Sequence, residues 1–249
     1  MPNWCNNTLI LKHNDPSMIV RARDAFNCGE LLKEFVPVPI CLTETIAGRA
    51  GPDGSPEQIA LEQRIQDNLN AYNYKDWYSF CVAEWGTKWD VGGDGRDPIE
   101  DDGTLTLSFD SAWAPPLAAM AEFQRQGFEV KLYYYESGMC FAGIFDAEGD
   151  EYYELGDMSS DEVAAAIPTE LDEMFGISEE MANYEDENLE IDLDGGLSAI
   201  NEQGCGEENL VELALDQIKK DVAKGDFTAI EELLCFVEPE RLRAFLSEY

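Results

Sequence analysis

This sequence contains segments with the side-chain patterns of strands and of helices, and the order of these segments limits the possible folds. Period-two alternation of apolar and polar residues predicts half-buried strands, as in TLTLSFD at 104–110. Proline at the first turn of a helical segment predicts where that helix starts. The resulting order is strand, helix, strand, strand, helix and strand, over residues 7–12, 18–26, 87–91, 104–110, 115–126 and 128–135. This order predicts an α+β fold of the ferredoxin-like kind, an antiparallel sheet with helices on one face.

Further segments surround this pattern. Residues 31–40 (LLKEFVPVPI) are apolar but contain two prolines, which predicts an extended segment at a sheet edge. The other expected elements are helices over 56–70 and 75–84, a loop over 92–103, and strands over 139–145 and 151–155 joined by an acidic turn. Residues expected in the sheet include Leu9, Leu105, Leu107, Val130 and Phe141.

The composition shifts after residue 155, where acidic residues become dense. A helix is expected over 160–175. The segment NLEIDLD at 188–194 alternates apolar and acidic residues, which predicts a strand with one apolar and one acidic face. We therefore expect an α+β domain over 1–155, followed by an acidic, mainly helical C-terminal region. That region comprises an acidic connection over 156–205 and a small helical hairpin over 206–249.

The net charge is the outlying feature of the composition. The chain has 52 Asp and Glu against 16 Lys and Arg, a formal net charge of −36, and residues 132 to 218 hold 25 acids and no Lys or Arg. Such a field repels nucleic acid and anionic membranes and attracts basic surfaces. A direct nucleic-acid binder would instead carry a basic patch. We expect a basic protein partner, with no direct binding to nucleic acid or to a membrane.

The remaining composition indicates a folded protein of the cytoplasm. Apolar residues make up 45% of the chain, with 12 Phe, 10 Tyr and 5 Trp, whereas a disordered acidic tail would be poor in aromatic residues. The 7 cysteines are widely spaced without a CxxC pair, which favours reduced thiols. The N-terminus lacks the basic and apolar run of a signal peptide, and no apolar stretch approaches transmembrane length. These features leave the oligomeric state open.

Residues suited to catalysis or metal binding are sparse. His13 is the sole histidine, and no Cys or His pair has the spacing of a zinc site. Neither a phosphate-binding glycine motif nor a nucleophile elbow occurs. Asp146, Glu148 and Asp150 resemble the start of a calcium loop, but the positions that follow break its pattern. We expect no cofactor, no metal and no catalytic residue, and therefore a binding protein rather than an enzyme.

Tryptophans gather in the first domain. A fold of this size needs large apolar fillers, so Trp85, Trp89 and Trp113 are expected to be buried at a corner of the core. On a regular strand, Lys88 would lie on the opposite face from Trp89. The alternative is an aromatic groove for a ligand or peptide. Its residues would be Trp4, Trp85, Trp89 and Trp113.

Four blocks of the first domain form a recognisable set. They are MPNWCNNTL at the N-terminus, WGTKWD at 85–90, AWAPP at 112–116 and GMCFAG at 138–143. In this order they resemble the YubB-like family of phage and plasmid proteins, which have a ferredoxin-like domain. GDFTAIEELL at 225–234 resembles a C-terminal helical segment of assorted small phage and plasmid proteins. The resemblance implies the fold and a mobile-element origin, and it assigns no role to any residue.

The first functional hypothesis is an anti-defence protein that binds and inhibits a nucleic-acid-handling host defence complex by DNA mimicry. Same-face residues of a strand repeat at about 6.6 Å, similar to the phosphate spacing of a single nucleic-acid strand. The expected strand over 188–194 would present three such charges, from Glu190, Asp192 and Asp194. Acids on the preceding helical segments would extend the stripe. These are Glu170, Glu173, Glu179 and Glu180.

Two other hypotheses remain open. One is a ligand-binding or enzymatic ferredoxin-like domain with a tryptophan-lined groove. The other is an accessory factor for replication or conjugation that docks on a basic host protein. Salt-sensitive binding to a basic protein would separate the mimic and the accessory factor from the ligand-binding domain. Competition with DNA for that protein would separate the mimic from the accessory factor.

Overall fold

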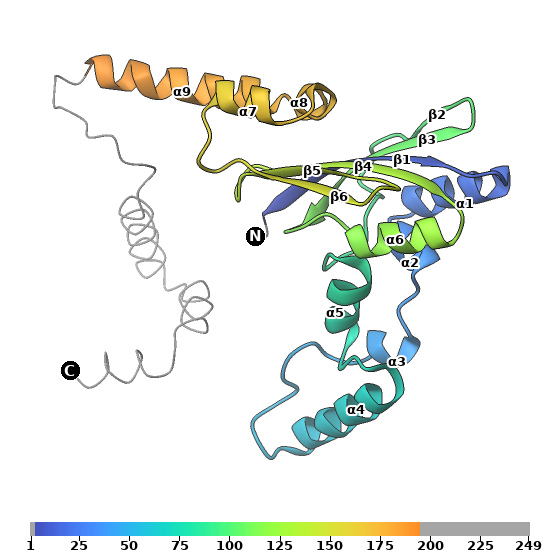
Figure 1. Cartoon of the computed structure of the whole chain (residues 1–249). Coiled ribbons are helices and arrows are strands. Elements are labelled where there is room, and N and C mark those ends of the chain that lie inside the picture. The colour runs from blue at the N-terminus through green and yellow to red at the C-terminus, as the bar shows by residue number, and fades with distance from the viewer. Residues whose placement is uncertain (1–2, 195–249) are drawn as a thin grey trace, which may run out of the picture. The chain divides into compact units, whose positions relative to one another are not determined.

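A six-stranded antiparallel sheet forms the centre of the structure (Figure 1). The computed structural model describes the backbone of residues 3–194 and the side chains of residues 3–185. The strand order is β2-β3-β1-β4-β5-β6. The strands are β1 (Trp4–Lys12), β2 (Ile99–Asp101), β3 (Thr104–Ala112), β4 (Glu129–Glu136), β5 (Phe141–Phe145) and β6 (Asp150–Glu154).

The first four strands have the ferredoxin-like connectivity. Helix α1 (Pro16–Asn27) lies between β1 and β2 in the chain, and α6 (Leu117–Arg125) lies between β3 and β4. Each helix thus connects two strands that are separated in the sheet by one antiparallel neighbour. The β-α-β-β-α-β order of this split arrangement is that of ferredoxin-like folds. The α+β class and the antiparallel sheet are therefore confirmed, and β5 and β6 extend the sheet as a meander.

Alternation along the central strands builds the core. Leu9 pairs with Leu107 and Leu11 with Leu105 across β1 and β3, and all four side chains are fully buried. They pack against α1 and α6 together with Phe26 and other apolar residues. The five residues expected in the sheet all lie in strands. These are Leu9, Leu105, Leu107, Val130 and Phe141.

An insertion between α1 and β2 carries one long helix, α4, and several short ones. They are α2 (Leu31–Phe35), α3 (Ile40–Thr43), α4 (Pro56–Tyr72), α5 (Trp77–Phe80) and a π-helical turn, η1 (Cys81–Trp85). The prediction of an extended segment over 31–40 is wrong. Leu31, Leu32 and Phe35 follow helical spacing and are buried, and the prolines occupy only the connection before α3.

The prediction of a strand over 87–91 is also wrong, because this segment is an irregular loop. The second strand of the fold is instead β2, inside the stretch expected to be a loop. Asp102 and Gly103 both have positive φ angles of 45° and 73° and connect β2 to β3. Positive φ at both central residues is the signature of the two-residue turn that joins hairpin strands.

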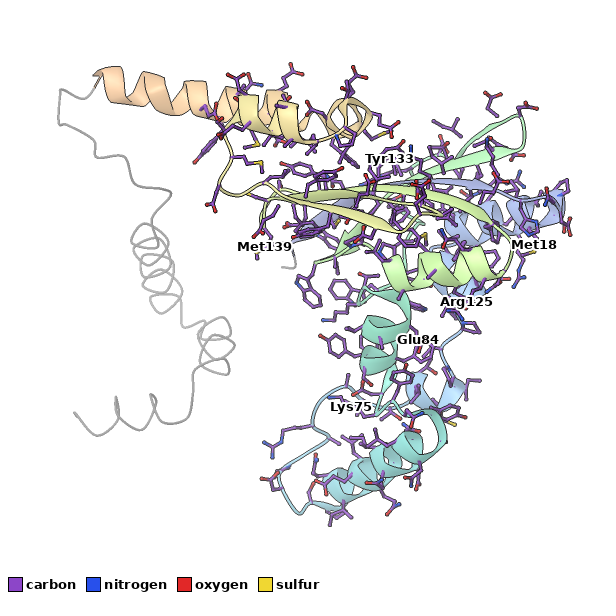
Figure 2. All side chains as sticks on the ribbon, in the orientation of Figure 1. Met18, Lys75, Glu84, Arg125, Tyr133 and Met139 are labelled. Carbon is purple, nitrogen blue, oxygen red and sulfur yellow. The ribbon has the colours of Figure 1, made fainter. Side chains whose placement is uncertain are left out.

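The second face of the sheet is covered at β4 and β5 by α7 (Ser160–Ala166), α8 (Thr169–Phe175) and α9 (Ile177–Asp194) (Figure 1). We call these three helices the acidic layer. A second apolar cluster joins it to β4 and β5 through Val163, Ile167, Leu171 and Ile177. Tyr133 lies on this face, toward the layer (Figure 2). Residues up to Asp194 form one compact unit, so the first part of the expected connection over 156–205 is a packed layer of helices.

The prediction of a strand over 188–194 is wrong, because these residues complete α9. No glycine or proline interrupts the chain between Ile177 and Asp194, and once a helix has nucleated each added residue extends it at little cost. The expected hairpin over 206–249 lies outside the described residues. Among the helices that the structure describes, none is long and apolar enough to cross a membrane.

Candidate functional site

Three exposed tryptophans form a row of neighbouring rings. The ring centroids of Trp4 and Trp89 are 6.0 Å apart, and those of Trp89 and Trp113 are 6.3 Å apart with nearly parallel planes. The exposed fractions are 47% for Trp4, 39% for Trp89 and 44% for Trp113. We call these residues the tryptophan row. Such large exposed apolar side chains, gathered in one place, are typical of binding surfaces.

The expected burial of the tryptophan corner is confirmed for Trp85 and wrong for its two neighbours. Trp85 is 4% exposed and its indole N–H donates to the carbonyl of Val36 at 2.9 Å. Trp89 follows in the irregular loop, so no strand pleat directs its ring into the core. Trp113 has a φ of 66°, a left-handed conformation that is strained for a bulky residue. The exposure of Trp4, Trp89 and Trp113 thus fits the alternative of an aromatic groove, whereas the burial of Trp85 does not.

Hydrogen bonds hold the loop that carries Trp89. The hydroxyl of Thr87 donates to the carbonyl of Ala112 at 3.0 Å, which ties the loop to the end of β3. The carboxylate of Asp90 accepts from the backbone N–H groups of Leu32 at 2.7 Å and Lys33 at 3.0 Å. Burial raises the pKa of Asp90 although these hydrogen bonds oppose the shift. The loop is therefore fixed at both ends, against β3 and against the first turn of α2.

A glycine allows the end of the same loop to approach the backbone of α1 closely. Gly92 has a φ of 96°, and a Cβ atom there would stand 2.2 Å from the carbonyl oxygen of Phe26. No other residue fits this approach without moving α1. The next N–H, of Gly93, donates to the same carbonyl at 2.8 Å.

Lys88 lies against the tryptophan row and not on the opposite side from Trp89 as a regular strand would require. Its ammonium nitrogen is 4.6 Å from the ring centroid of Trp89 and 5.2 Å from that of Trp113. A third ring, of Tyr78, is 5.7 Å away. Attraction between a cation and aromatic faces holds the ammonium here.

Two hollows flank Trp89 and Asp90. The smaller, of about 230 Å³, lies beside Trp4 and the end of β3. The larger, of about 390 Å³, lies between α2 and η1 and is lined by Trp85 and Lys88 as well. Three of the four tryptophans proposed for a groove thus line hollows that share Trp89, while Trp113 stacks on it.

The four sequence blocks singled out in the first domain meet at one end of the sheet. Trp4 begins β1 and pairs with Ala112 at the end of β3. The backbone N–H of Trp113 donates to the carbonyl of Asn3 at 2.9 Å, and Thr87 bonds to Ala112. Gly138 lies so close to Asn3 that a Cβ atom there would stand 2.8 Å from its Nδ2, and the adjacent Met139 lies in the turn between β4 and β5 (Figure 2). Segments far apart in the chain therefore build a single surface.

The acidic residues proposed for partner binding on α8 and α9 are exposed. They are Glu170, Glu173, Glu179 and Glu180. Glu170 forms an ion pair with Lys131 at 2.8 Å, and this hydrogen bond holds the pKa of Glu170 below its usual value. Other acids of the layer have structural partners: Glu162 caps α7 through Ser159, and Glu185 accepts from Ser160. The acids proposed for partner binding are thus different residues from Glu162 and Glu185, which hydrogen-bond within the layer.

The proposed row of Glu190, Asp192 and Asp194 does not exist as a strand face. All three residues belong to α9, where positions two apart lie on different sides of the helix and positions four apart share one. The spacing of about 6.6 Å that suggested a match to phosphates applies only to a strand. Any likeness of the layer to nucleic acid therefore rests on helical acids.

Reactive side chains do not gather at this surface. Burial raises the pKa of Cys5 and of Cys81 to about 12, so neither is a thiolate near neutral pH. His13 lies at the other end of β1, where its Nε2 is 3.3 Å from the carbonyl oxygen of Gln126. Among the side chains of residues 3–185, no group of His, Cys, Asp or Glu is arranged to hold a metal ion.

Burial predicts different reactivities for the cysteines of the described chain. Iodoacetamide added to the native protein near pH 8 should modify Cys28 and Cys41, which are exposed, far faster than Cys5 and Cys81. Peptide mass spectrometry over a time course measures each rate. Denaturant should make the four rates similar. Equal rates in the native protein would contradict the placement of Cys5 in the core.

Comparisons with known proteins add little to the geometry. No family model matches the chain, and no curated protein matches it. Among solved structures, protein api92 from Yersinia pseudotuberculosis is similar with a TM-score of 0.32 and 11% sequence identity. The similarity covers 64% of this chain and 100% of that one. The candidate surfaces are thus defined by this chain's own residues, namely the tryptophan row and the exposed face of the acidic layer.

Proposed function

We propose that this chain is a binding protein that docks through its acidic layer on the basic surface of a nucleic-acid-handling host or defence protein and inhibits it. One observation carries the proposal. The layer is anchored to the sheet by buried apolar residues, while its outward side presents carboxylates that have almost no cationic neighbours.

The ion pairs of the described residues support this division. Basic residues elsewhere in the unit pair with carboxylates, for example Arg21 with Glu34 and Arg96 with Asp110. Among residues 160–185 of the layer, the only acid in such a pair is Glu170, whose partner Lys131 comes from β4. Glu173, Glu179 and Glu180 have no ion-pair partner among residues 3–185. Their charges add to the field that a basic partner meets.

The mode of inhibition we propose is competition with DNA. A basic channel that binds phosphates gains its affinity from charge neutralisation, and a rigid acidic surface offers the same charge without a strand to cleave. Such association is fast and weakens with ionic strength, because exposed charges are screened beyond about 8 Å at physiological salt. Kinship to the YubB-like phage and plasmid proteins is part of this proposal, since mobile elements gain from blocking host defences.

The tryptophan row supports a second candidate function, in which this end of the sheet binds a ligand. The observation that favours it is the row itself, three exposed rings beside two hollows and a strained Trp113. Strained backbone persists where surrounding structure enforces it, often at ligand sites. The two functions use different surfaces and are not exclusive.

Neutralising the outward acids should weaken partner binding and leave the fold intact. We expect the triple variant Glu173→Gln, Glu179→Gln and Glu180→Gln to melt at or slightly above the temperature of the unchanged protein, because like-charge repulsion is relieved. Its affinity for a partner captured from host lysate at low salt should fall by roughly tenfold. Surface plasmon resonance at two salt concentrations measures this loss.

The matched control neutralises three exposed acids on α4, namely Glu57, Glu62 and Asp67. It changes the net charge equally, so a loss confined to the first variant locates the interface on the acidic layer. Labelled duplex DNA then tests mimicry on the captured partner. If the partner binds DNA and this protein together with no mutual weakening, competition is wrong and a docking role, such as that of a replication or conjugation accessory factor, remains.

A further inference from the structure

The larger hollow beside Trp89 has the size and walls of a small-molecule site. Its volume is about 390 Å³, within the range of roughly 300–1,000 Å³ that ligand sites occupy. We call it the α2 hollow. Its apolar walls come from the insertion between α1 and β2 and from the loop that follows. They are Val38, Trp77, Cys81, Trp85 and Trp89.

These walls are held in place without a ligand. The indole of Trp85 is fixed by its bond to the carbonyl of Val36, and the carboxylate of Asp90 fixes the loop against α2. A site formed in advance avoids much of the ordering cost of binding. The walls of the hollow therefore need no rearrangement to accept a planar ring against Trp77 or Trp89.

The charges that line the α2 hollow leave one group unpaired. Glu30 accepts from the ammonium of Lys33 at 2.5 Å. Asp90 accepts from three backbone N–H groups, the third being its own neighbour's, that of Val91. Lys88 pairs with no carboxylate among the described residues and meets only aromatic faces. In a chain of net charge −36, Lys88 is thus an ammonium at a hollow that is available to pair with an anion.

We propose that the α2 hollow binds a small planar aromatic ligand that carries one acidic group, with the ring against the tryptophans and the anion on Lys88. This site lies apart from the acidic layer and goes beyond docking on a basic protein. A cationic ligand is disfavoured because both carboxylates are already engaged. A nucleic-acid strand is disfavoured because the acidic surface around the hollow repels further phosphates.

The anion can be a carboxylate or a phosphate, and matched probes distinguish the two. Indole-3-acetate and adenosine 5′-monophosphate each pair a planar ring with an acidic group. Indole-3-acetamide and adenosine are their uncharged counterparts. Isothermal titration calorimetry of the full chain at low salt measures all four, because tryptophan fluorescence would be obscured by the indole probes. We expect at least one anion to bind about tenfold more tightly than its uncharged counterpart.

Lys88→Met removes the charge and keeps an unbranched side chain over the rings. It should abolish the preference for the anion and leave the melting temperature within a few degrees. Lys75→Met is the control, because Lys75 is exposed and does not line the hollow. Trp89→Ala should weaken the anion and its counterpart alike by removing the stacking wall.

The outcomes decide the proposal. Preference for indole-3-acetate assigns the carboxylate as the anion, and preference for the nucleotide assigns the phosphate. No binding by either anion overturns the proposal, as does equal binding of charged and uncharged probes or a preference that survives Lys88→Met. The variant neutralised at Glu173, Glu179 and Glu180 should bind the probes normally, so failure here leaves the docking function untouched.

Discussion

Replacing Trp85 with alanine should lower the free energy of unfolding by about 3–5 kcal/mol. Its ring is almost fully buried in the main core, and its N–H satisfies the carbonyl of Val36. Truncation therefore leaves both a cavity and an unpaired buried acceptor. For a chain of this size the melting temperature should fall by about 6–20 °C. Circular dichroism during thermal and urea unfolding measures both quantities.

The matched variant is Trp89→Ala, which should lower the free energy of unfolding by only about 1–2 kcal/mol, through the loss of its two aromatic contacts, with Trp4 and Trp113. Its ring is more than a third exposed, so little core is lost. The difference between the two losses tests whether the tryptophan row is exposed and contributes little to the stability of the fold. Equal losses for Trp85 and Trp89 would mean that the row supports the fold, and its assignment to binding would fail.

Much of the sheet is predictable from the sequence because side-chain period reports burial directly. β3 alternates strictly between buried and more exposed residues at 104–109, and its apolar members Leu105 and Leu107 are fully buried. β2 was missed because three residues provide too few alternations, although the Asp102-Gly103 pair is a hairpin signal. The sequence does not reveal α2, because Pro37 and Pro39 follow it closely and favour an extended segment, although they lie beyond its last residue, Phe35.

The candidate site was predictable only as a set of residue types. Nothing in the spacing of Trp89 and Trp113 reveals their exposure, because both depend on irregular backbone whose path is fixed by distant partners. Asp90 bonds to α2, and Gly92 is placed by the carbonyl of Phe26. Such contacts join residues about sixty positions apart, and they produce no repeating pattern of apolar and polar residues in the sequence. In the acidic half, alternation over 188–194 suggested a strand, but an uninterrupted helical segment prevails.

The acidic layer matters for function only if it is a fixed part of the fold, and truncation of the chain tests this. A chain that ends after Leu155 would expose the apolar face of β4 and β5. The side chains that lose their cover are Tyr133, Tyr135, Ala142 and Ile144. We expect this chain to aggregate or to unfold without a cooperative transition, whereas a chain that ends after Asp194 should melt cooperatively, since the compact unit ends there.

A point substitution makes the same test without shortening the chain. Leu171 is fully buried between α8 and the sheet, so Leu171→Ala should lower the free energy of unfolding by about 2–5 kcal/mol. Glu173→Ala, on the same helix but exposed, should change it by less than about 0.5 kcal/mol. If the chain ending at Leu155 melts like the longer one and Leu171→Ala has no effect, the layer is not part of the folded unit. Its carboxylates would then lack fixed positions, and a rigid surface could no longer explain competition with DNA. If Leu171→Ala lowers the free energy of unfolding and Glu173→Ala does not, the positions of the carboxylates depend on the packing beneath them.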